Sequence, residues 1–428
     1  MSLISNIQAT LSGNCPFKKA KPVHVENVAI IGAGLSGLTL ALALYQHSIP
    51  CTIYEARSAP LNIGGAIMLS PNALRILDLL GVYERIRHEG YEFDKLYFRS
   101  PANQPLDEYE FGGEEKYGYR GMRIYRHVLI RELSTMLKEA NIPIHYHKKF
   151  VRVVSETDTD VTWEFDDGTS AFATCLVGAD GIHSKVRKYL YPALEPKFTN
   201  AMGVTASVPT KQLQVPDEYN LPVTIMNKQH GAFVIAPQQR DGSEVLIGRQ
   251  KRAPELDREG WNQLMDDKAW CIDFLRQGAS DFPGIVQRAV SEISPENINV
   301  WPFYVVPKLD TWSSTHGRVV ILGDAAHAIP PSAGQGINQA FEDVYTYALI
   351  VANRNRDSIE KALRIWQQGR QERVDKVLAL NSQIDKRRMP KPAGQEDAED
   401  DDKPFELDWL YKPDFNEMVD EWLRKDAQ

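Results

Sequence analysis

The feature that most constrains the fold of this chain is a glycine-rich turn between an apolar strand and an apolar helix. Residues 28–31 are consecutively apolar, and residues 32–37 then read GAGLSG, the spacing G-x-G-x-x-G. Apolar residues follow at helical spacing through Leu44, and a second strand is expected at 51–55. This order predicts a strand–turn–helix–strand unit of a parallel α/β sheet.

Each glycine of this turn has a physical role if the unit binds a dinucleotide. Gly32 permits the tight turn, Gly34 lets a pyrophosphate approach the backbone, and Gly37 lets the helix pack closely on the strand. The helix N-terminus then offers amide donors to the phosphates. Glu55 ends the second strand, where it can accept from a ribose 2′-hydroxyl and repel a 2′-phosphate. The nucleotide is therefore expected to be of the FAD or NAD type, with a purely structural glycine turn as the alternative.

The bulk composition limits the remaining choices. With 428 residues and 43% hydrophobic content, the chain predicts two domains plus extensions. A formal net charge of −8, without a basic stripe interleaved with aromatic residues, argues against a nucleic-acid partner. The four cysteines are far apart and form no Cys/His cluster, which predicts reduced thiols, an intracellular protein and no metal site.

No targeting or membrane segment is expected. Residues 1–22 look like an irregular arm and lack the continuous apolar core of a signal peptide. The longest apolar stretch, at residues 38–44, is far shorter than the roughly 20 residues that cross a bilayer. We therefore expect a soluble, cytoplasmic monomer or homodimer.

The rest of the chain alternates between two kinds of pattern. Repeated short strand signals fill residues 200–305, with a helical patch near 257–276, and predict a mostly β region. Residues 100–121 are rich in Gly, Pro and Tyr and are expected to form loops and short strands. Outside these regions, helical periodicity predicts helices at 71–80, 123–140, 336–352 and 358–385.

The C-terminal segment divides into two parts of opposite character. Residues 396–402 hold six acidic residues and are expected to be a solvated loop. Residues 405–423 contain Trp409, Tyr411, Phe415 and Trp422, so this stretch is expected to pack back on the body.

Two further motifs decide between FAD and NAD. Residues 318–327 read RVVILGDAAH and are followed by Pro330, Pro331 and the sequence GQGIN at 334–338. Residues 175–181 read CLVGADG. Together with the glycine turn, these motifs resemble the GD and DG motifs of the class A, single-component FAD-dependent monooxygenases, the para-hydroxybenzoate and salicylate hydroxylase family. The resemblance covers about residues 25–385.

The resemblance implies a fold and a domain order. It predicts an α/β fold with a Rossmann-like FAD-binding domain, an inserted, mostly β substrate domain, and C-terminal helices. The expected FAD-binding domain is discontinuous, the substrate domain fills the gaps, and an acidic loop with a C-terminal extension completes the chain. The corresponding residues are 22–90, 118–198 and 305–385 for the first, 91–117 and 199–304 for the second, and 386–428 for the third.

The resemblance also implies which residues contact a non-covalently bound FAD. The glycine turn meets the pyrophosphate, the Glu55 region meets the adenosine half, and the GD motif meets the ribityl chain and the flavin ring. The alternatives are a helix N-cap for Asp324 and a turn aspartate for Asp180, which the family uses for both FAD and NAD(P)H. The implied cofactor-binding residues are Gly32, Gly34, Ser36, Gly37, Glu55, Arg57, Gly65, Arg126, Asp180, Asp324, Gly336 and Ile337.

The implied activity is the hydroxylation of a small aromatic compound such as a phenol, an aniline or a polyketide-like ring. By resemblance, NADH or NADPH reduces the FAD, O2 adds at flavin C4a, and the resulting hydroperoxyflavin transfers electrophilic oxygen to the ring. The sequence holds one complete G-x-G-x-x-G fingerprint. We therefore expect the nicotinamide to dock transiently rather than in a second Rossmann domain.

Substrate activation commonly needs a base or a cation near the phenol or amine. His230, Arg249 and Tyr304 are the candidates, because each lies on or beside an expected strand of the β-rich region. The competing interpretations are a surface histidine, an exposed strand arginine and a core tyrosine. His327, close to Asp324, is expected to order its loop by a hydrogen bond.

Other functions remain possible for the same motifs. Epoxidation or another oxygenation of a natural product would use the same flavin chemistry. A non-catalytic FAD-fold binding protein is an alternative of another class. A flavin halogenase is set aside, because residues 301–307 read WPFYVVP and not the WxWxIP tract expected of that class.

Overall fold

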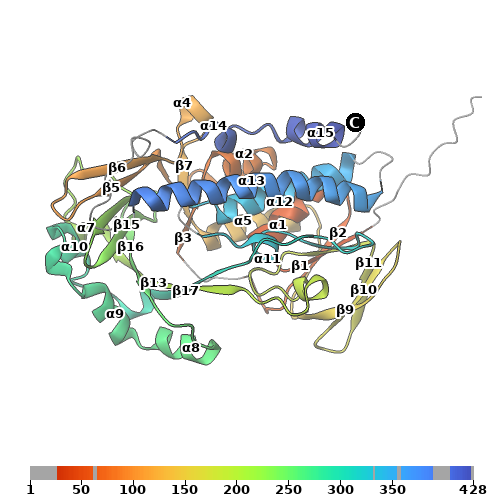
Figure 1. Cartoon of the computed structure of the whole chain (residues 1–428), viewed down its shortest axis with the longest axis horizontal. Helices are drawn as coiled ribbons and strands as arrows, with labels where there is room; N and C mark the ends of the chain where they lie inside the picture. The colour runs from red at the N-terminus through yellow and green to blue at the C-terminus, as the bar shows by residue number, and fades with distance from the viewer. Residues whose placement is uncertain (1–26, 61–64, 331–332, 354–357, 389–404, 426–428) are drawn as a thin grey trace, which may run out of the picture.

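A five-stranded parallel sheet is the centre of one half of the molecule (Figure 1). The computed structural model describes residues 27–60, 65–330, 333–353, 358–388 and 405–425. Every neighbouring pair of this sheet runs parallel. In spatial order the strands are β18 (Val319–Ile321), β12 (Cys175–Gly178), β1 (Val28–Ile31), β2 (Cys51–Tyr54) and β8 (Ile144–His145).

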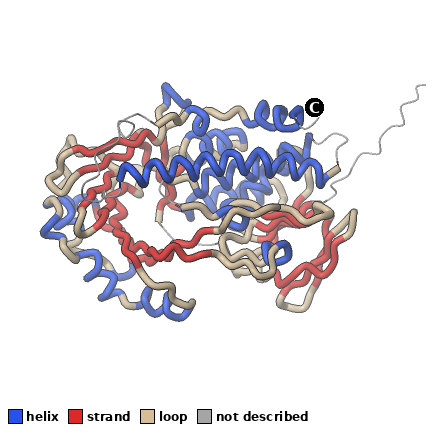
Figure 2. The backbone as a smooth tube through the Cα atoms, viewed as in Figure 1, coloured by secondary structure: helices blue, strands red, loops and turns tan. Residues whose placement is uncertain are grey.

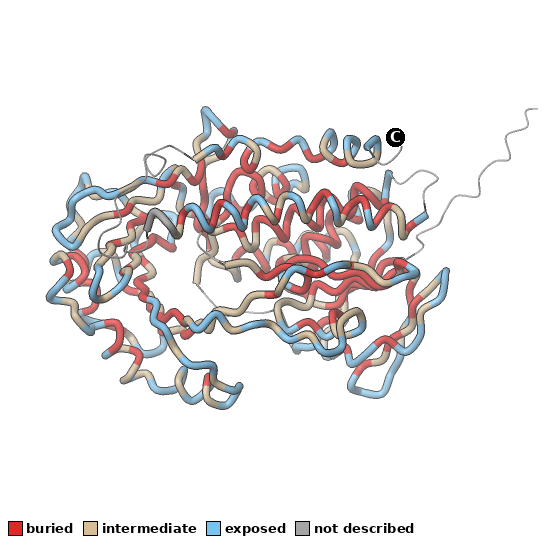
Figure 3. Tube along the Cα trace, viewed as in Figure 1, coloured by how far each residue is buried: buried red, intermediate tan, exposed pale blue. Residues whose placement is uncertain are grey.

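Both faces of this sheet are covered, which explains why its central strands are apolar throughout. One face carries α1 (Leu35–Gln46), α5 (Arg126–Glu139) and α12 (Gly336–Asn353). The other carries a three-stranded antiparallel sheet of β9 (Phe150–Glu156), β10 (Val161–Phe165) and β11 (Ser170–Ala173). The ring of Tyr54 meets that of Trp163 edge-on at 5.6 Å. Figure 3 shows the buried backbone of the sheet and of α12.

A seven-stranded sheet forms the second half of the molecule (Figure 2). Its neighbours pair antiparallel except for one parallel pair, β14 with β5. In spatial order its strands are β17 (Ile298–Val305), β13 (Lys197–Pro209), β16 (Glu244–Arg252), β15 (Gly231–Pro237), β14 (Val223–Asn227), β5 (Lys95–Arg99) and β6 (Pro105–Glu110).

The register of this sheet separates an outer face from an inner face, because side chains alternate along each strand. Ile247 pairs with Ala206 and Ile235, and all three are buried in the core beneath α8 (Arg258–Asp266), α9 (Lys268–Arg276) and α10 (Gly284–Ala289). We call this side the outer face. The neighbouring residue Leu246 belongs to the inner face, where a Cβ at Gly65 would lie 3.4 Å from its Cδ1. The inner face therefore looks toward the first half of the molecule.

A small sheet lies where the two halves meet. It contains β3 (Ala66–Leu69), β7 (Gly121–Tyr125) and β4 (Tyr91–Phe93), with β7 in the middle. The Ala66 amide donates to Oε1 of Gln238 at 2.9 Å, directly after β15. This bond joins the small sheet to the inner face of the seven-stranded sheet.

Helices from the C-terminal part of the chain close the molecule on the side of α12. α13 (Ile359–Arg388) lies along α12, and α14 (Asp408–Tyr411) and α15 (Phe415–Lys425) pack against the body through buried Tyr411, Phe415 and Val419. None of the described helices combines the length and the apolar content that crossing a bilayer requires. The remaining helices are α2 (Pro71–Leu79), α3 (Tyr83–Ile86), α4 (Glu114–Tyr117), α6 (Arg187–Leu190), α7 (Thr210–Leu213), α11 (Asp324–His327) and the 3₁₀ turns η1 (Ala279–Asp281) and η2 (Pro295–Asn297).

The predicted α/β class, with a parallel sheet and a β-rich second part, is confirmed. The predicted helix at 123–140 is wrong at its start, because residues 121–125 form β7 and the helix begins at Arg126. Residues 100–121 include helix α4 besides strand β6. The domain boundaries stay a prediction. The N-terminal arm, Pro331 and the acidic run at 396–402 lie outside the described residues.

Candidate active site

The glycine turn joins β1 to α1 in a conformation that glycine alone tolerates at two positions. Gly32 has φ +108°, and a Cβ there would lie 2.6 Å from the Ala179 carbonyl oxygen. A Cβ at Gly37 would lie 2.0 Å from the Gly32 carbonyl oxygen. A Cβ at Gly34 would meet no atom within 4 Å. Gly32 and Gly37 are thus required by the fold itself, whereas the space in front of Gly34 is open.

Glu55 fastens this turn to the end of β2. Its Oε2 accepts from the Ala33 amide at 2.8 Å, and its Oε1 accepts from the Arg57 amide at 2.9 Å and from the Arg57 guanidinium at 3.2 Å. Glu55 is buried, while the Arg57 side chain is 58% exposed. The carboxylate therefore organises the turn, and its contact with a ribose hydroxyl stays a prediction.

A cavity of about 430 Å³ begins at the glycine turn and runs to a second turn nearly 300 residues away in sequence. Its wall combines the start of α1, strand β3, the start of α5, the segment after β12, and the segment from the end of β18 into α12. The lining residues are Gly34, Leu35, Ser36, Ile67, Met68, Arg126, Ala179, Gly181, Leu322, Asp324, Ile329, Gly334, Gly336, Ile337 and Ala340.

An acidic residue, Asp324, and a basic residue, Arg126, both line this cavity. Burial raises the pKa of the Asp324 carboxyl, while electrostatic interactions with the nearby His327 and Arg126 oppose that rise. Burial likewise lowers the pKa of the Arg126 guanidinium, with Asp324 opposing. Within the described part of the chain, the buried Nε of Arg126 has no hydrogen-bond partner. The cavity thus holds an acceptor and an unused donor on its wall.

The far end of the cavity is the N-terminus of α12. Gly334 has φ +64°, and a Cβ there would lie 2.9 Å from Cε of Met68 and 3.1 Å from the ring of Phe111. A Cβ at Gly336 would meet nothing within 4 Å. The first amides of a helix have no acceptor within the helix. Amide donors and the positive end of the helix dipole therefore face open space here.

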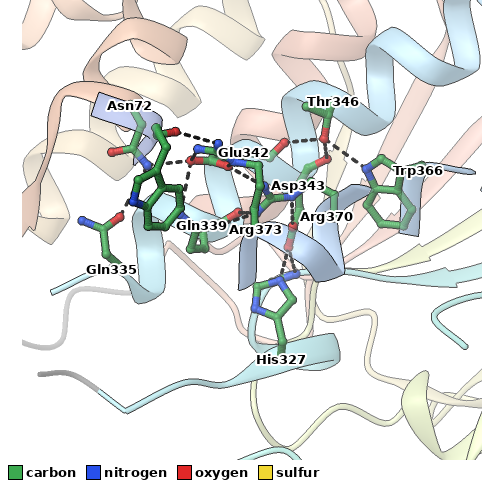
Figure 4. A network of polar contacts seen from close by, with 12 residues as sticks. Asn72, His327, Gln335, Gln339, Glu342, Asp343, Thr346, Trp366, Arg370 and Arg373 are labelled. Atoms are coloured by element: carbon green, nitrogen blue, oxygen red, sulfur yellow. Dashed lines mark hydrogen bonds and ion pairs between the residues drawn. The ribbon is translucent and has the colours of Figure 1, made fainter. Parts of the chain in front are cut away.

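A buried polar network, drawn in Figure 4, holds the turn that carries Asp324. Oδ2 of Asp343 on α12 accepts from the Gly323 amide at 2.8 Å and pairs with Nε2 of His327 at 2.5 Å. Oδ1 of Asp343 accepts from Nε of Arg370 on α13 at 2.8 Å. The expected ordering role of His327 matches this contact.

The neighbouring residue Glu342 extends the network to α2 and α13. Its carboxylate accepts from Nδ2 of Asn72 at 2.8 Å, from Nη2 of Arg373 at 2.7 Å and from the Arg370 guanidinium. Burial pushes the pKa of the Glu342 carboxyl upward, but attraction to Arg373 and Arg370 outweighs it and lowers the pKa. Two carboxylates therefore stay charged inside the protein because two guanidinium groups balance them.

Asp180 of the DG motif organises its own loop. Its Oδ2 accepts from the amides of Lys185 at 2.7 Å and Val186 at 3.2 Å. Burial raises the pKa of this carboxyl, and its buried Oδ1 has no partner among the described residues. The turn interpretation therefore accounts for Oδ2, and a contact of Oδ1 with a nucleotide stays a prediction.

The described residues fit an extended dinucleotide that carries a flavin ring. The openings at Gly34 and Gly336 sit at two helix N-termini, where amides can bind anionic groups. The unpaired Nε of Arg126 and the carboxylate of Asp324 lie between these ends on the same cavity wall. Gly65, next to β3, faces Gln238 and Leu246 rather than the lining of this cavity.

The three candidates for substrate activation lie apart from this cavity. Arg249 is on the outer face, where its guanidinium donates to the carbonyl oxygens of Phe274, Gln277 and His230. His230 pairs through Nε2 with Oδ2 of Asp281 at 2.7 Å. The Tyr304 hydroxyl accepts from Nε1 of Trp261 at 3.3 Å, and Trp261 belongs to the outer-face core. Each side chain has a structural contact, and the catalytic role of each stays a prediction.

The structure adds polar residues that the sequence patterns did not single out. Gln238 is fully buried, and its Nε2 donates to Oγ of Ser207 at 2.6 Å and to the Tyr125 hydroxyl at 3.0 Å. Arg123, two residues before Tyr125 on β7, is also buried. The sequence signal that could have indicated this site is a polar residue, Gln238, directly after an apolar strand.

Comparison with known proteins gives a consistent family. Residues 26–380 match the family described as FAD binding domain. The chain is 31% identical over 360 residues to the 3-amino-4-hydroxybenzoate 2-monooxygenase PtnB3 of Streptomyces platensis, covering 83% of this chain and 86% of the relative. It is 28% identical over 363 residues to the 6-hydroxynicotinate 3-monooxygenase of Bordetella bronchiseptica, covering 82% of this chain and 89% of the relative.

A solved structure has the same fold at lower sequence identity. A salicylate hydroxylase in complex with its substrate superposes with a TM-score of 0.74 at 21% identity, covering 93% of this chain and 98% of the other. This likeness concerns the fold, since identity is low, and it extends over nearly the whole of both chains.

Proposed function

Since the chain belongs to the FAD binding domain family and is a class A FAD-dependent aromatic monooxygenase, we propose that it uses NAD(P)H and O2 to hydroxylate a small aromatic ring. The observation that supports this most strongly is the single cavity that joins the glycine turn to the α12 N-terminus. The relatives act on 3-amino-4-hydroxybenzoate and 6-hydroxynicotinate, which are small aromatic rings.

In this proposal, residues along the length of the cavity would hold the FAD. The amides of Gly34 and Ser36 bind the pyrophosphate, and Gly32 and Gly37 shape the turn beneath it. Glu55 and Arg57 lie at the adenosine end. The segment with Asp180 takes part in binding both FAD and NAD(P)H, as expected from the sequence.

Residues at the other end of the cavity would hold the flavin half. Asp324 accepts hydrogen bonds from the ribityl chain, and Nε of Arg126 donates to the cofactor. The amides of Gly336 and Ile337, with the dipole of α12, stabilise negative charge at the pyrimidine edge of the ring. Gly65 directly precedes strand β3, which lines the cavity through Ile67 and Met68.

The protein contributes position, electrostatics and exclusion of water, while bound FAD supplies electron transfer from NAD(P)H and activation of O2. Met68 and Ile329 give the cavity an apolar section of wall. Exclusion of water from this space would favour oxygen transfer to the ring.

The proposal also covers the binding of the nicotinamide, the location and oligomeric state of the enzyme, and the class of ligand. The nicotinamide docks transiently, because the sequence has one dinucleotide fingerprint. The enzyme works in the cytoplasm as a monomer or homodimer. The site binds aromatic compounds rather than nucleic acid, in keeping with the net charge of −8.

The test uses the purified full-length protein. We expect bound flavin in the visible absorption spectrum, NAD(P)H oxidation that accelerates when an aromatic substrate is added, and a product that gains one oxygen atom from ¹⁸O₂. A flavin-loaded protein whose NAD(P)H oxidation never responds to substituted phenols, anilines or hydroxypyridines would instead favour a binding protein. Epoxidation remains the second candidate, and an epoxide product from an alkene-bearing aromatic would select it.

A further inference from the structure

Arg123 lies next to Met68, a residue that lines the cavity between the glycine turn and α12. It is in the middle of β7, where its register partners are Met68 on β3 and Tyr91 on β4. Cross-strand partners point to the same face with Cβ atoms about 5 Å apart. Met68 lines the cavity. The guanidinium of Arg123 therefore enters the region between the small sheet and the inner face.

The contacts of Arg123 leave its charge without a counter-ion. Its Nε donates to the Pro237 carbonyl oxygen at 2.7 Å, and its Nη2 makes a long contact of 3.5 Å to the Ala66 carbonyl oxygen. Among the described residues, no carboxylate pairs with it and Nη1 has no hydrogen bond. The side chain is only 6% exposed, and burial lowers the pKa of its guanidinium to about 10.

A buried charge of this kind costs stability unless an anion compensates it. Nearby polar groups do not supply that anion. Glu244 is the carboxylate of this corner, and it is engaged by the Tyr125 hydroxyl and, at 3.4 Å, by Nε2 of Gln238. Nη1 of Arg123, together with the second N–H of Nη2, thus remains available to donate to a planar anionic group.

We propose that Arg123 is a specificity residue that binds a carboxylate on the aromatic substrate. The inference rests on the proposed function and adds the substrate class, an aromatic acid hydroxylated on its ring. Two observations converge on it: a buried guanidinium without a protein counter-ion beside the cavity wall, and relatives that act on a benzoate and a nicotinate. The competing explanation is that Arg123 only ties β3 to the end of β15.

The experiment compares ring acids with their neutral counterparts. The probes are salicylate with phenol, 3-amino-4-hydroxybenzoate with 2-aminophenol, and 6-hydroxynicotinate with 2-hydroxypyridine. Binding is followed through the absorption spectrum of the bound flavin, and turnover through NAD(P)H oxidation. The native enzyme should bind at least one acid roughly tenfold or more tightly than its neutral partner, because a charged hydrogen-bonded pair is gained.

Variants at Arg123 separate recognition from scaffolding. Arg123→Met should weaken binding of the acid roughly 10–100-fold and leave binding of the neutral partner unchanged. Arg123→Lys should weaken it less, because the charge remains while the planar fork is lost. Arg120→Met is the matched control, since Arg120 precedes the same strand but pairs with Asp94 at 2.9 Å and is half-exposed. It should leave both affinities unchanged.

Two results would overturn the inference. One is equal binding of acid and neutral partner, or binding of neither, by the native flavin-loaded enzyme. The other is a parallel loss for acid and neutral partner in Arg123→Met, which indicates a brace. Should Arg123→Met not retain flavin, Arg123→Lys decides by the same ratio. Failure of the proposed function looks different: no bound flavin, or no aromatic compound that accelerates NAD(P)H oxidation.

Discussion

Two glycines of the same turn serve different purposes, and their surroundings tell them apart. A Cβ at Gly37 would collide with the Gly32 carbonyl oxygen, whereas a Cβ at Gly34 would meet nothing within 4 Å. We predict that Gly37→Ala destabilises the protein strongly. Gly34→Ala should keep the melting temperature of the flavin-free protein but weaken FAD binding by about tenfold or more, since the pyrophosphate needs that space.

Isothermal titration of the flavin-free variants with FAD, beside thermal melts, measures both effects. The interpretation of Gly34 fails if Gly34→Ala binds FAD as tightly as the native chain. It fails equally if the variant loses stability to the same extent as Gly37→Ala.

Arg126 is predicted to contact the cofactor rather than to stabilise the fold. Its buried Nε lacks a partner in the described residues, so Arg126→Met leaves no protein acceptor unsatisfied there. We expect FAD affinity to fall roughly 10–100-fold, the value of a hydrogen bond from a charged donor, with little change in melting temperature. Arg131→Met is the control on the same helix, because its ion pairs with Glu89 and Glu132 are at the surface. A similar loss of FAD in both variants would contradict the assignment.

At single positions, the sequence indicates backbone requirements better than side-chain directions. The glycine turn and Asp324 were recognisable because their spacing is tied to one backbone geometry. Arg249 was chosen because it lies on a strand, yet it shares parity with Val245 and Ile247, which are buried in the outer-face core. That alternation of buried side chains could have predicted that Arg249 points to the outer face. Arg123 had no such signal, since its neighbours across the strands come from distant sequence.

Between elements, the buried ion network of α12 and α13 should make stability depend on pH. The pKa of the Glu342 carboxyl is lowered in the folded protein, so its contribution is complete above the unfolded pKa of about 4.3 and is lost as pH falls through the folded value. At pH 7, Glu342→Gln should cost about 3–5 kcal/mol, because two buried guanidinium groups lose a charged partner.

This difference between the native chain and Glu342→Gln should shrink as the pH falls below about 4.3, the unfolded pKa. Urea unfolding at a series of pH values measures it, with the exposed-site variant Glu421→Gln as the control. A difference that stays constant over this range would contradict the charged state assigned to Glu342.

Element types were predictable where periodicity was long, as in α12 and α13. The start of α5 was misplaced because Ile124 and the apolar residues after it share helical spacing, while residues 121–125 are held as strand β7 by β3 and β4. Those partners lie more than 25 residues away in sequence. Local propensity therefore could not reveal the strand, nor the ion network between α12 and α13.

At the scale of the whole molecule, the C-terminal helix α15 approaches α13 closely at one glycine. A Cβ at Gly369 on α13 would lie 2.2 Å from the ring of Trp422 on α15. We predict that Gly369→Ala destabilises the protein by about 1–3 kcal/mol through overpacking. In a Trp422→Ala background the same change should be neutral or stabilising by up to about 1 kcal/mol, because alanine favours a helix over glycine.

A double-mutant cycle of urea unfolding energies measures this coupling. Equal effects of Gly369→Ala in both backgrounds would show that α15 does not rest on α13 in this way. FAD affinity should stay unchanged in all four proteins, since neither residue lines the cavity.

The overall architecture was predictable because three motifs at wide separation point to one fold. What the motifs could not give is how the two halves face each other. The bond from Ala66 to Gln238 and the placement of Arg123 depend on that arrangement. Substrate recognition therefore had to be read from the structure.

The most direct test of the central claim is a crystal structure of the FAD-loaded protein. The account predicts the pyrophosphate at the amides of Gly34 and Ser36, the ribityl chain at Asp324, and the flavin ring at the amides of Gly336 and Ile337. A flavin bound elsewhere, or a cavity in which the glycine turn and the α12 N-terminus hold separate ligands, would contradict it.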